Sequence, residues 1–183
     1  MIHLIKSSIV FLLFTVVAIA QKPVPQWLST ASQTVQEFKL CMVNKHGNSD
    51  CHSHLHSLLK TVYAQIILEA DLPLSPKAIA TYLDSTSNWI RIGPAKDQTV
   101  LSKSQEIANQ GQPVLAVSAF EPIGHIAIIL PGQLQRSKQW NLSVPNSASL
   151  FRHKPQLSYL HKKLSYAFTK PDHIWLYAHQ PEQ

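Results

Sequence analysis

The hydrophobic pattern of this chain changes period near Gly111, and this change most constrains its fold. Before that point, apolar residues recur at intervals of three and four, which is the spacing of a helix that buries one face. After it, short apolar segments are separated by turns that contain glycine or proline, a pattern typical of strands. Helices followed by strands predict an α+β fold, with N-terminal helices packed on a C-terminal antiparallel sheet.

The boundaries of the expected elements come from the same pattern and from local turn and cap signals. Helices are expected over residues 27–42, 52–69, 76–85 and 100–109, with Ser75 and Thr99 as N-caps. Strands are expected over residues 114–119, 125–130, 140–144 and 173–179, with a short apolar segment at 89–92. The first two of these strands read as a hairpin. Residues 147–168 have a mixed pattern, compatible with a short helix near Ser149.

The N-terminal segment has the features of a secretory signal peptide. Lys6 supplies a positive charge, residues 8–17 are apolar, and Ala18-Ile19-Ala20 is an A-x-A cleavage pattern. We therefore expect a signal peptide over residues 1–20 and a single domain over 21–183, which is periplasmic or secreted. The apolar run is shorter than the roughly 20 residues that span a membrane. An uncleaved anchor is the alternative, and no membrane span is expected after cleavage.

The charge balance leaves two interpretations open. The formal net charge of the 183 residues is +6, and the basic residues are spread along the chain. They could form an ordinary solvated surface, or they could attract a polyanion such as a cell-wall polymer or a membrane face. The chain has no recognisable nucleic-acid-binding motif, so no nucleic-acid partner is expected.

A candidate nucleophile, Cys51, lies directly before an amphipathic helical stretch. A cysteine at a helix N-terminus faces the positive end of the helix dipole, which favours the thiolate over the thiol. The candidate base is His125, which follows Gly124 and opens an apolar strand. Acyl transfer by cysteine needs a thiolate, a base within hydrogen-bond reach and a third polar group that orients the base. Packing of the predicted hairpin against the second helix would bring the first two together.

The remaining groups of such a site are asparagines. Asn146, which follows the predicted strand 140–144, is the candidate orienting residue, and Asn141 is the alternative. The backbone N–H of Cys51, with Asn48 or Asn44 from the preceding loop, would form the oxyanion hole. No metal and no cofactor is expected in this site.

The cysteine helix and the histidine strand together resemble the papain-like cell-wall amidases and peptidases of the NlpC/P60 and CHAP superfamily. The similarity is carried by Cys51 at a helix start and by residues 124–132, GHIAIILPG, and it covers roughly residues 45–180. It implies a papain-like fold and a cysteine hydrolase that cleaves an amide bond in peptidoglycan peptides. By position, it implies Cys51 as nucleophile, His125 as general base and Asn146 as orienting residue. Where NlpC/P60 enzymes typically have Asp-Cys-Ser-Gly, this chain has Asp50-Cys51-His52-Ser53, closer to the CHAP pattern.

We expect the partners of such an enzyme to be a peptidoglycan peptide as substrate and, as a further candidate, a protein inhibitor. A monomer is expected.

Two alternatives compete with the hydrolase hypothesis. In an oxidising compartment, Cys41 and Cys51 could form a disulfide, which would remove the nucleophile. On a helix, His52 and His56 share a face, so they could form a metal site with Cys51, whereas His54 would point away. The alternative function is therefore a secreted metal-binding or wall-binding protein that uses the cluster of Cys51, His52, His54 and His56 without catalysis.

Overall fold

The computed structural model describes residues 26–44, 51, 53–62, 75–119 and 124–180. Within these residues the protein is an α+β structure, with four α-helices and a six-stranded antiparallel sheet. The α+β prediction is therefore confirmed. The predicted signal peptide, Asn48 and His52 lie outside the described residues.

The last strand of the chain lies inside the sheet rather than at its edge. The six strands are arranged in the order β1 (Trp89–Pro94), β8 (Ile174–His179), β2 (Val114–Ser118), β3 (His125–Ile129), β6 (Asn146–Ser149) and β7 (Tyr159–Lys163). A separate two-stranded sheet consists of β4 (Gln135–Ser137) and β5 (Leu142–Val144). The predicted hairpin is confirmed, because β2 and β3 pair antiparallel with Ala116 opposite Ala127. Because β8 pairs with both β1 and β2, the C-terminal segment completes the sheet.

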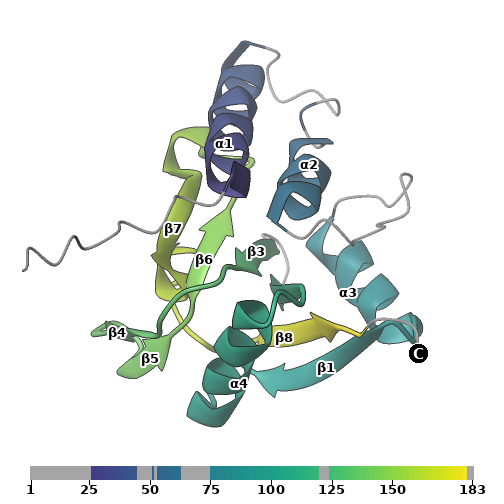
Figure 1. Cartoon of the computed structure of the whole chain (residues 1–183), viewed down its shortest axis with the longest axis vertical. Coiled ribbons are helices and arrows are strands. Elements are labelled where there is room, and N and C mark those ends of the chain that lie inside the picture. The colour runs from purple at the N-terminus through teal and green to yellow at the C-terminus, as the bar shows by residue number, and fades with distance from the viewer. Residues whose placement is uncertain (1–25, 45–50, 52, 63–74, 120–123, 181–183) are drawn as a thin grey trace, which may run out of the picture.

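The sheet separates two hydrophobic cores. Figure 1 shows how the helices are arranged around the sheet. One face is covered by α1 (Gln26–Asn44), α2 (Ser53–Val62) and α3 (Pro76–Ser85). The other face is covered by α4 (Gln98–Asn109), the β4–β5 hairpin and the 3₁₀ helix η3 (Leu164–Tyr166). Side chains alternate between the two faces along each strand, so consecutive residues of β3 enter different cores.

Local cap chemistry explains where two helices begin. The Ser75 hydroxyl accepts a hydrogen bond from the Ala78 N–H at 3.1 Å, which confirms Ser75 as the N-cap of α3. The predicted cap of the next helix is wrong by two residues. Asp97 caps α4, and its carboxylate accepts from both the backbone N–H and the hydroxyl of Thr99. These hydrogen bonds lower the pKa of Asp97, because they stabilise its charged form.

Two predictions for the C-terminal half differ from the structure. Residues near Ser149 form the buried strand β6 and not a helix. The sequence did not indicate a strand there, because both faces of β6 are covered and its residues therefore show no alternation of apolar and polar types. The strand predicted over residues 140–144 is shorter, at Leu142–Val144, and pairs with β4 outside the main sheet.

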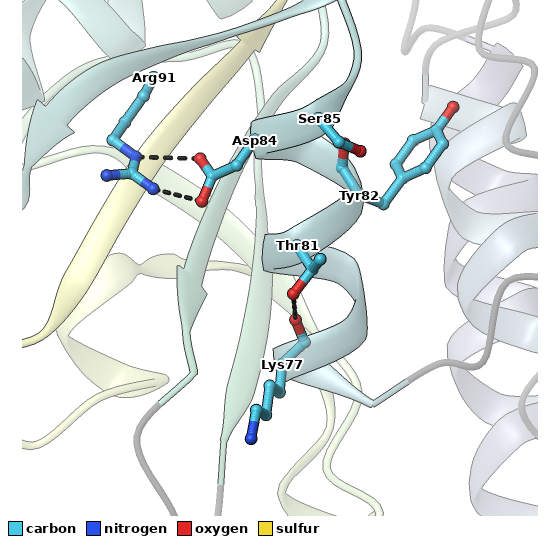
Figure 2. Close-up of polar contacts among 6 residues, drawn as sticks. All are labelled: Lys77, Thr81, Tyr82, Asp84, Ser85 and Arg91. Atoms are coloured by element: carbon cyan, nitrogen blue, oxygen red, sulfur yellow. Dashed lines mark hydrogen bonds and ion pairs between the residues drawn. The ribbon is translucent and has the colours of Figure 1, made fainter.

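The helix α3 is joined to the sheet edge by an ion pair (Figure 2). The Nε of Arg91 donates to Asp84 Oδ1 at 3.1 Å, and a second guanidinium nitrogen donates to Oδ2. Arg91 also stacks over the ring of Trp175, 4.7 Å from its centre. The pair is partly exposed, so we expect it to contribute at most about 1 kcal/mol. This ion pair connects α3 to the edge strand β1 and is not part of the candidate functional site.

Candidate functional site

The sulfur of Cys51 is not free. It forms a disulfide with Cys41 of α1, and Cys51 itself is completely buried. A disulfide sulfur carries neither the proton nor the negative charge that a nucleophilic thiolate needs. The prediction that Cys51 is a thiolate nucleophile is therefore wrong for this oxidised chain, and the alternative Cys41–Cys51 disulfide is confirmed.

His125 faces the core opposite to the one that holds α2. Its neighbours on β3 alternate, with Ile126 in the core that contains Leu58 of α2 and Ala127 in the other core. The imidazole of His125 lies on the same face of the sheet as Ala127, because it contacts the ring of Phe168, which belongs to that second core. The sheet therefore lies between this imidazole and the helix that follows Cys51. The predicted pairing of the two side chains is not formed.

The imidazole of His125 is held instead by Ser149 of β6. The Nε2 of His125 lies 2.7 Å from Ser149 Oγ, which lies 2.7 Å from the carbonyl oxygen of Ile126. The hydroxyl has one proton, which it donates to the Ile126 carbonyl, so it accepts from the Nε2–H. Phe151 stacks on the ring at 4.3 Å, and Phe168 meets it edge-on. This arrangement fixes one neutral tautomer of His125, with the lone pair on Nδ1.

The same geometry argues against Ser149 as a serine nucleophile. A serine attacks when a histidine accepts its proton, whereas the Ser149 proton is directed to the Ile126 carbonyl. Ser149 is also only 1% exposed. Sequence reasoning missed Ser149, because a small polar residue in a strand gives no local signal of its partner.

We expect His125 to remain neutral throughout the range from about pH 5 to 8. Burial lowers its pKa from 6.5 to about 4. In the unfolded chain the pKa returns to about 6.5, so the unfolded state takes up the proton first as the pH falls. The free energy of unfolding should therefore decrease between about pH 6.5 and 4, by about 3 kcal/mol in total. NMR titration of the imidazole checks the pKa, and a midpoint near 6.5 in the folded protein would contradict it.

Asn146 lies at the far end of the strand pair from His125. Its backbone oxygen accepts from the Leu130 N–H, five residues along β3 from the histidine, a distance of roughly 16 Å along the strand. The Asn146 amide donates to the Pro131 carbonyl at 3.1 Å and to Nδ1 of His161 at 2.8 Å. The prediction that Asn146 orients His125 is therefore wrong. The residue that contacts the His125 imidazole is Ser149.

Three further asparagines were predicted in the site: Asn141 as the alternative orienting residue, and Asn44 and Asn48 as oxyanion-hole donors. Asn44 is the exposed last residue of α1. Asn141 lies in the β4–β5 turn at φ 54°, where its side-chain oxygen accepts from Arg136. Asn48 lies outside the described residues. With Cys51 in a disulfide, its sulfur cannot make the attack that such an oxyanion hole would serve.

Two histidines of the cluster that follows Cys51, His54 and His56, belong to the described residues, whereas His52 does not. His54 packs edge-on against Phe38, with ring centres 6.2 Å apart. Burial, and secondarily the charge of Lys60, lower the pKa of His56. Cys51 cannot join these residues as a thiolate ligand while it is in the disulfide. Among the described residues, no three His, Cys, Asp or Glu side chains are grouped as metal ligands.

A shallow groove of about 420 Å³ lies elsewhere, between α4 and the segment that follows β3. Most of the residues that line it are of polar types, and they include Gln105, Asn109 and Gln133. None of the predicted catalytic residues lines it, so the groove gives no support to the predicted triad.

Comparison with known proteins does not assign the chain to a family. No protein-family model matches the chain, and no curated protein sequence matches it. In the part of the chain that the structure describes, no helix has both the length and the apolar character needed to cross a membrane.

Proposed function

We propose that this chain is an exported cell-wall-binding protein that acts without thiol catalysis while its cysteines are bridged. The observation that carries the proposal is the Cys41–Cys51 disulfide, which leaves no free cysteine in the described chain. The position of His125 on the other side of the sheet gives a second, independent argument. The net charge of +6 suits a ligand that carries anionic groups. No comparable observation supports the alternative of a metal-binding protein.

The test is one assay with two measurements. Oxidised wild-type protein is incubated with purified peptidoglycan; the bound fraction is measured by sedimentation and the soluble fragments by chromatography. We expect binding without release of fragments. A Cys41→Ala/Cys51→Ala double variant should bind to the same extent, because the proposed binding uses no thiol. Failure of the wild-type protein to sediment with peptidoglycan would refute the proposal.

Hydrolysis of an amide bond in peptidoglycan peptides, on a papain-like scaffold of the NlpC/P60 type, is the second candidate. The specific observation in its favour is the neutral imidazole of His125, whose tautomer Ser149 fixes so that Nδ1 can accept a proton. This function requires a dithiol reductant, which would convert the disulfide into two thiols and become a disulfide itself. It also requires a rearrangement that brings Cys51 to the face of the sheet that holds His125.

The same assay under reducing conditions separates the two candidates. Release of fragments by reduced wild-type protein, abolished by Cys51→Ala and by His125→Ala, would establish the hydrolase. No release under either redox condition favours the binding protein.

A further inference from the structure

One segment of the chain carries more net positive charge than the chain as a whole, whose net charge is +6. Residues 122–171 contain no aspartate or glutamate, yet they contain seven of the chain's 16 lysines and arginines. We call these seven residues the basic face: Arg136, Lys138, Arg152, Lys154, Lys162, Lys163 and Lys170. All seven are exposed. They lie on β4, β7 and the adjoining turns, on the side of the molecule away from α3 and β1 (Figure 1).

Contacts between separate elements hold the central part of the basic face together. The Lys163 ammonium of β7 donates to the Arg136 carbonyl of β4 at 3.2 Å. The Lys162 ammonium lies 3.8 Å from the centre of the Tyr166 ring, a cation–π contact. The contact between Lys163 and the Arg136 backbone brings β7 and β4 together, although more than twenty residues separate Arg136 from Lys162 and Lys163 in the sequence.

A second contact extends the face toward the β4–β5 turn. The side chain of Gln139 donates to the carbonyl of Thr169 at 2.7 Å. The residues next to these two in the chain are Lys138 and Lys170, so this contact brings two further cations of the face into the same region.

These charges are not neutralised within the described chain. None of the seven cations forms an ion pair there, whereas Arg91 at the opposite edge of the sheet is paired with Asp84. A surface of one sign, without internal counter-charges, attracts ligands of the opposite sign over distances up to the Debye length.

The side chains of the face fit carboxylates better than a lipid surface. Ammonium and guanidinium groups donate several hydrogen bonds each, and the guanidinium matches a carboxylate in shape. Binding of a basic surface to a membrane is strengthened by apolar side chains that insert between lipids. Within 124–171, the described exposed large apolar side chains are only Leu157 and Tyr166.

We propose that the basic face binds the free carboxylates of peptidoglycan peptides. This inference rests on the proposed wall-binding function and deepens it, because it assigns the surface and the ligand chemistry. A polymer with repeated carboxylates suits a broad face of several cations, since many weak contacts then act together.

Neutralisation of the central cations tests the assignment. We expect Arg136→Gln/Lys162→Gln/Lys163→Gln to weaken binding to peptidoglycan at least about tenfold, because three charge contacts are lost. The matched control, Lys60→Gln/Lys77→Gln/Lys103→Gln, removes three exposed charges from α2, α3 and α4 and should bind like the wild type. The charge-retaining variant Arg136→Lys/Lys162→Arg/Lys163→Arg should keep most of the binding. Circular dichroism verifies that each variant is folded.

Chemical modification of the ligand tests the carboxylate. Peptidoglycan freed of accessory polymers is amidated with carbodiimide and a neutral amine, which replaces free carboxylates with amides. Binding of the wild type should fall about as far as it does for the triple glutamine variant. Equal binding to amidated material, or equal binding by both triple glutamine variants, would overturn the basic face as the carboxylate site while leaving wall binding intact. Tighter binding to phosphatidylglycerol vesicles than to peptidoglycan would also overturn it. Absence of any wild-type binding to peptidoglycan would instead remove the proposed function itself.

Discussion

Replacement of Cys41 and Cys51 by alanine should lower the free energy of unfolding by about 3 kcal/mol. This value follows from the entropy that the disulfide removes from the unfolded chain when it closes a loop across a separation of ten residues. The double variant should still fold, because Phe38 of α1 and Leu58 and Leu59 of α2 remain buried in the first core. Chemical denaturation of the oxidised wild type and of the variant measures the difference.

Thiol titration provides the control for this experiment. Denatured wild-type protein, prepared without reductant, should contain no reactive thiol, whereas a Cys41→Ala single variant should contain one. An unfolding free energy of the double variant within about 1 kcal/mol of the wild type would show that the disulfide contributes little. One or two thiols in denatured wild-type protein would show that the bond is absent, and would reopen the assignment of Cys51 as a nucleophile.

Substitution of Gln105 by methionine should destabilise the fold by about 3 kcal/mol, although the two side chains are similar in size. The buried amide of Gln105 joins α4 to two strands of the main sheet. Its Nε2 donates to the Leu130 carbonyl at 2.8 Å, and its Oε1 accepts from the Asn146 N–H at 2.9 Å. Methionine can replace neither bond, so a buried carbonyl and a buried N–H would be left without these partners.

The exposed glutamine at the C-cap of the same helix, Gln110, is the matched control for Gln105. Gln110→Met, at the C-terminal end of α4, should change the free energy of unfolding by less than about 0.5 kcal/mol. Both values come from urea denaturation under identical conditions. Equal stability of the two variants would mean that the amide bridge does not stabilise the packing of α4.

Local sequence signals were sufficient for much of the fold. The apolar spacing predicted α1 and α3, and Ser75 followed by Pro76 predicted where α3 begins. The hairpin of β2 and β3 was predictable because its two apolar segments are close in sequence and the residues between them include proline and glycine, which favour turns. Each of these features depends on residues that are neighbours in the chain, so the chain itself contains the information.

The strand β6 shows where local signals are insufficient. Asn146, Ser147, Ala148 and Ser149 are all buried, yet three of them are polar and none has a high strand propensity. They form a strand because β3 and β7 supply hydrogen-bond partners on both sides. For the same reason, the position of β8 between β1 and β2 could not be predicted from its own residues.

The candidate site shows the same limit. The sequence identified His125 at the start of an apolar strand, but its partner depends on the register between β3 and β6. That register brings Ser149 to the imidazole and leaves Asn146 near Leu130. Side-chain alternation then directs the imidazole away from the layer of α2. A shift of one residue in β3 would reverse the face, and nothing local to His125 excludes such a shift.

By itself, the sequence determined the class of the fold, the positions of most helices and the strand pair β2–β3, because hydrophobic periodicity and caps act between near neighbours. It also contained both cysteines, without deciding between a thiolate and a disulfide. Tertiary structure made that decision by bringing the Cα atoms of Cys41 and Cys51 to 5.7 Å from each other. It also assembled cations of β4 and β7 into one face. Contacts between distant residues depend on how whole elements pack, so only the folded chain could specify them.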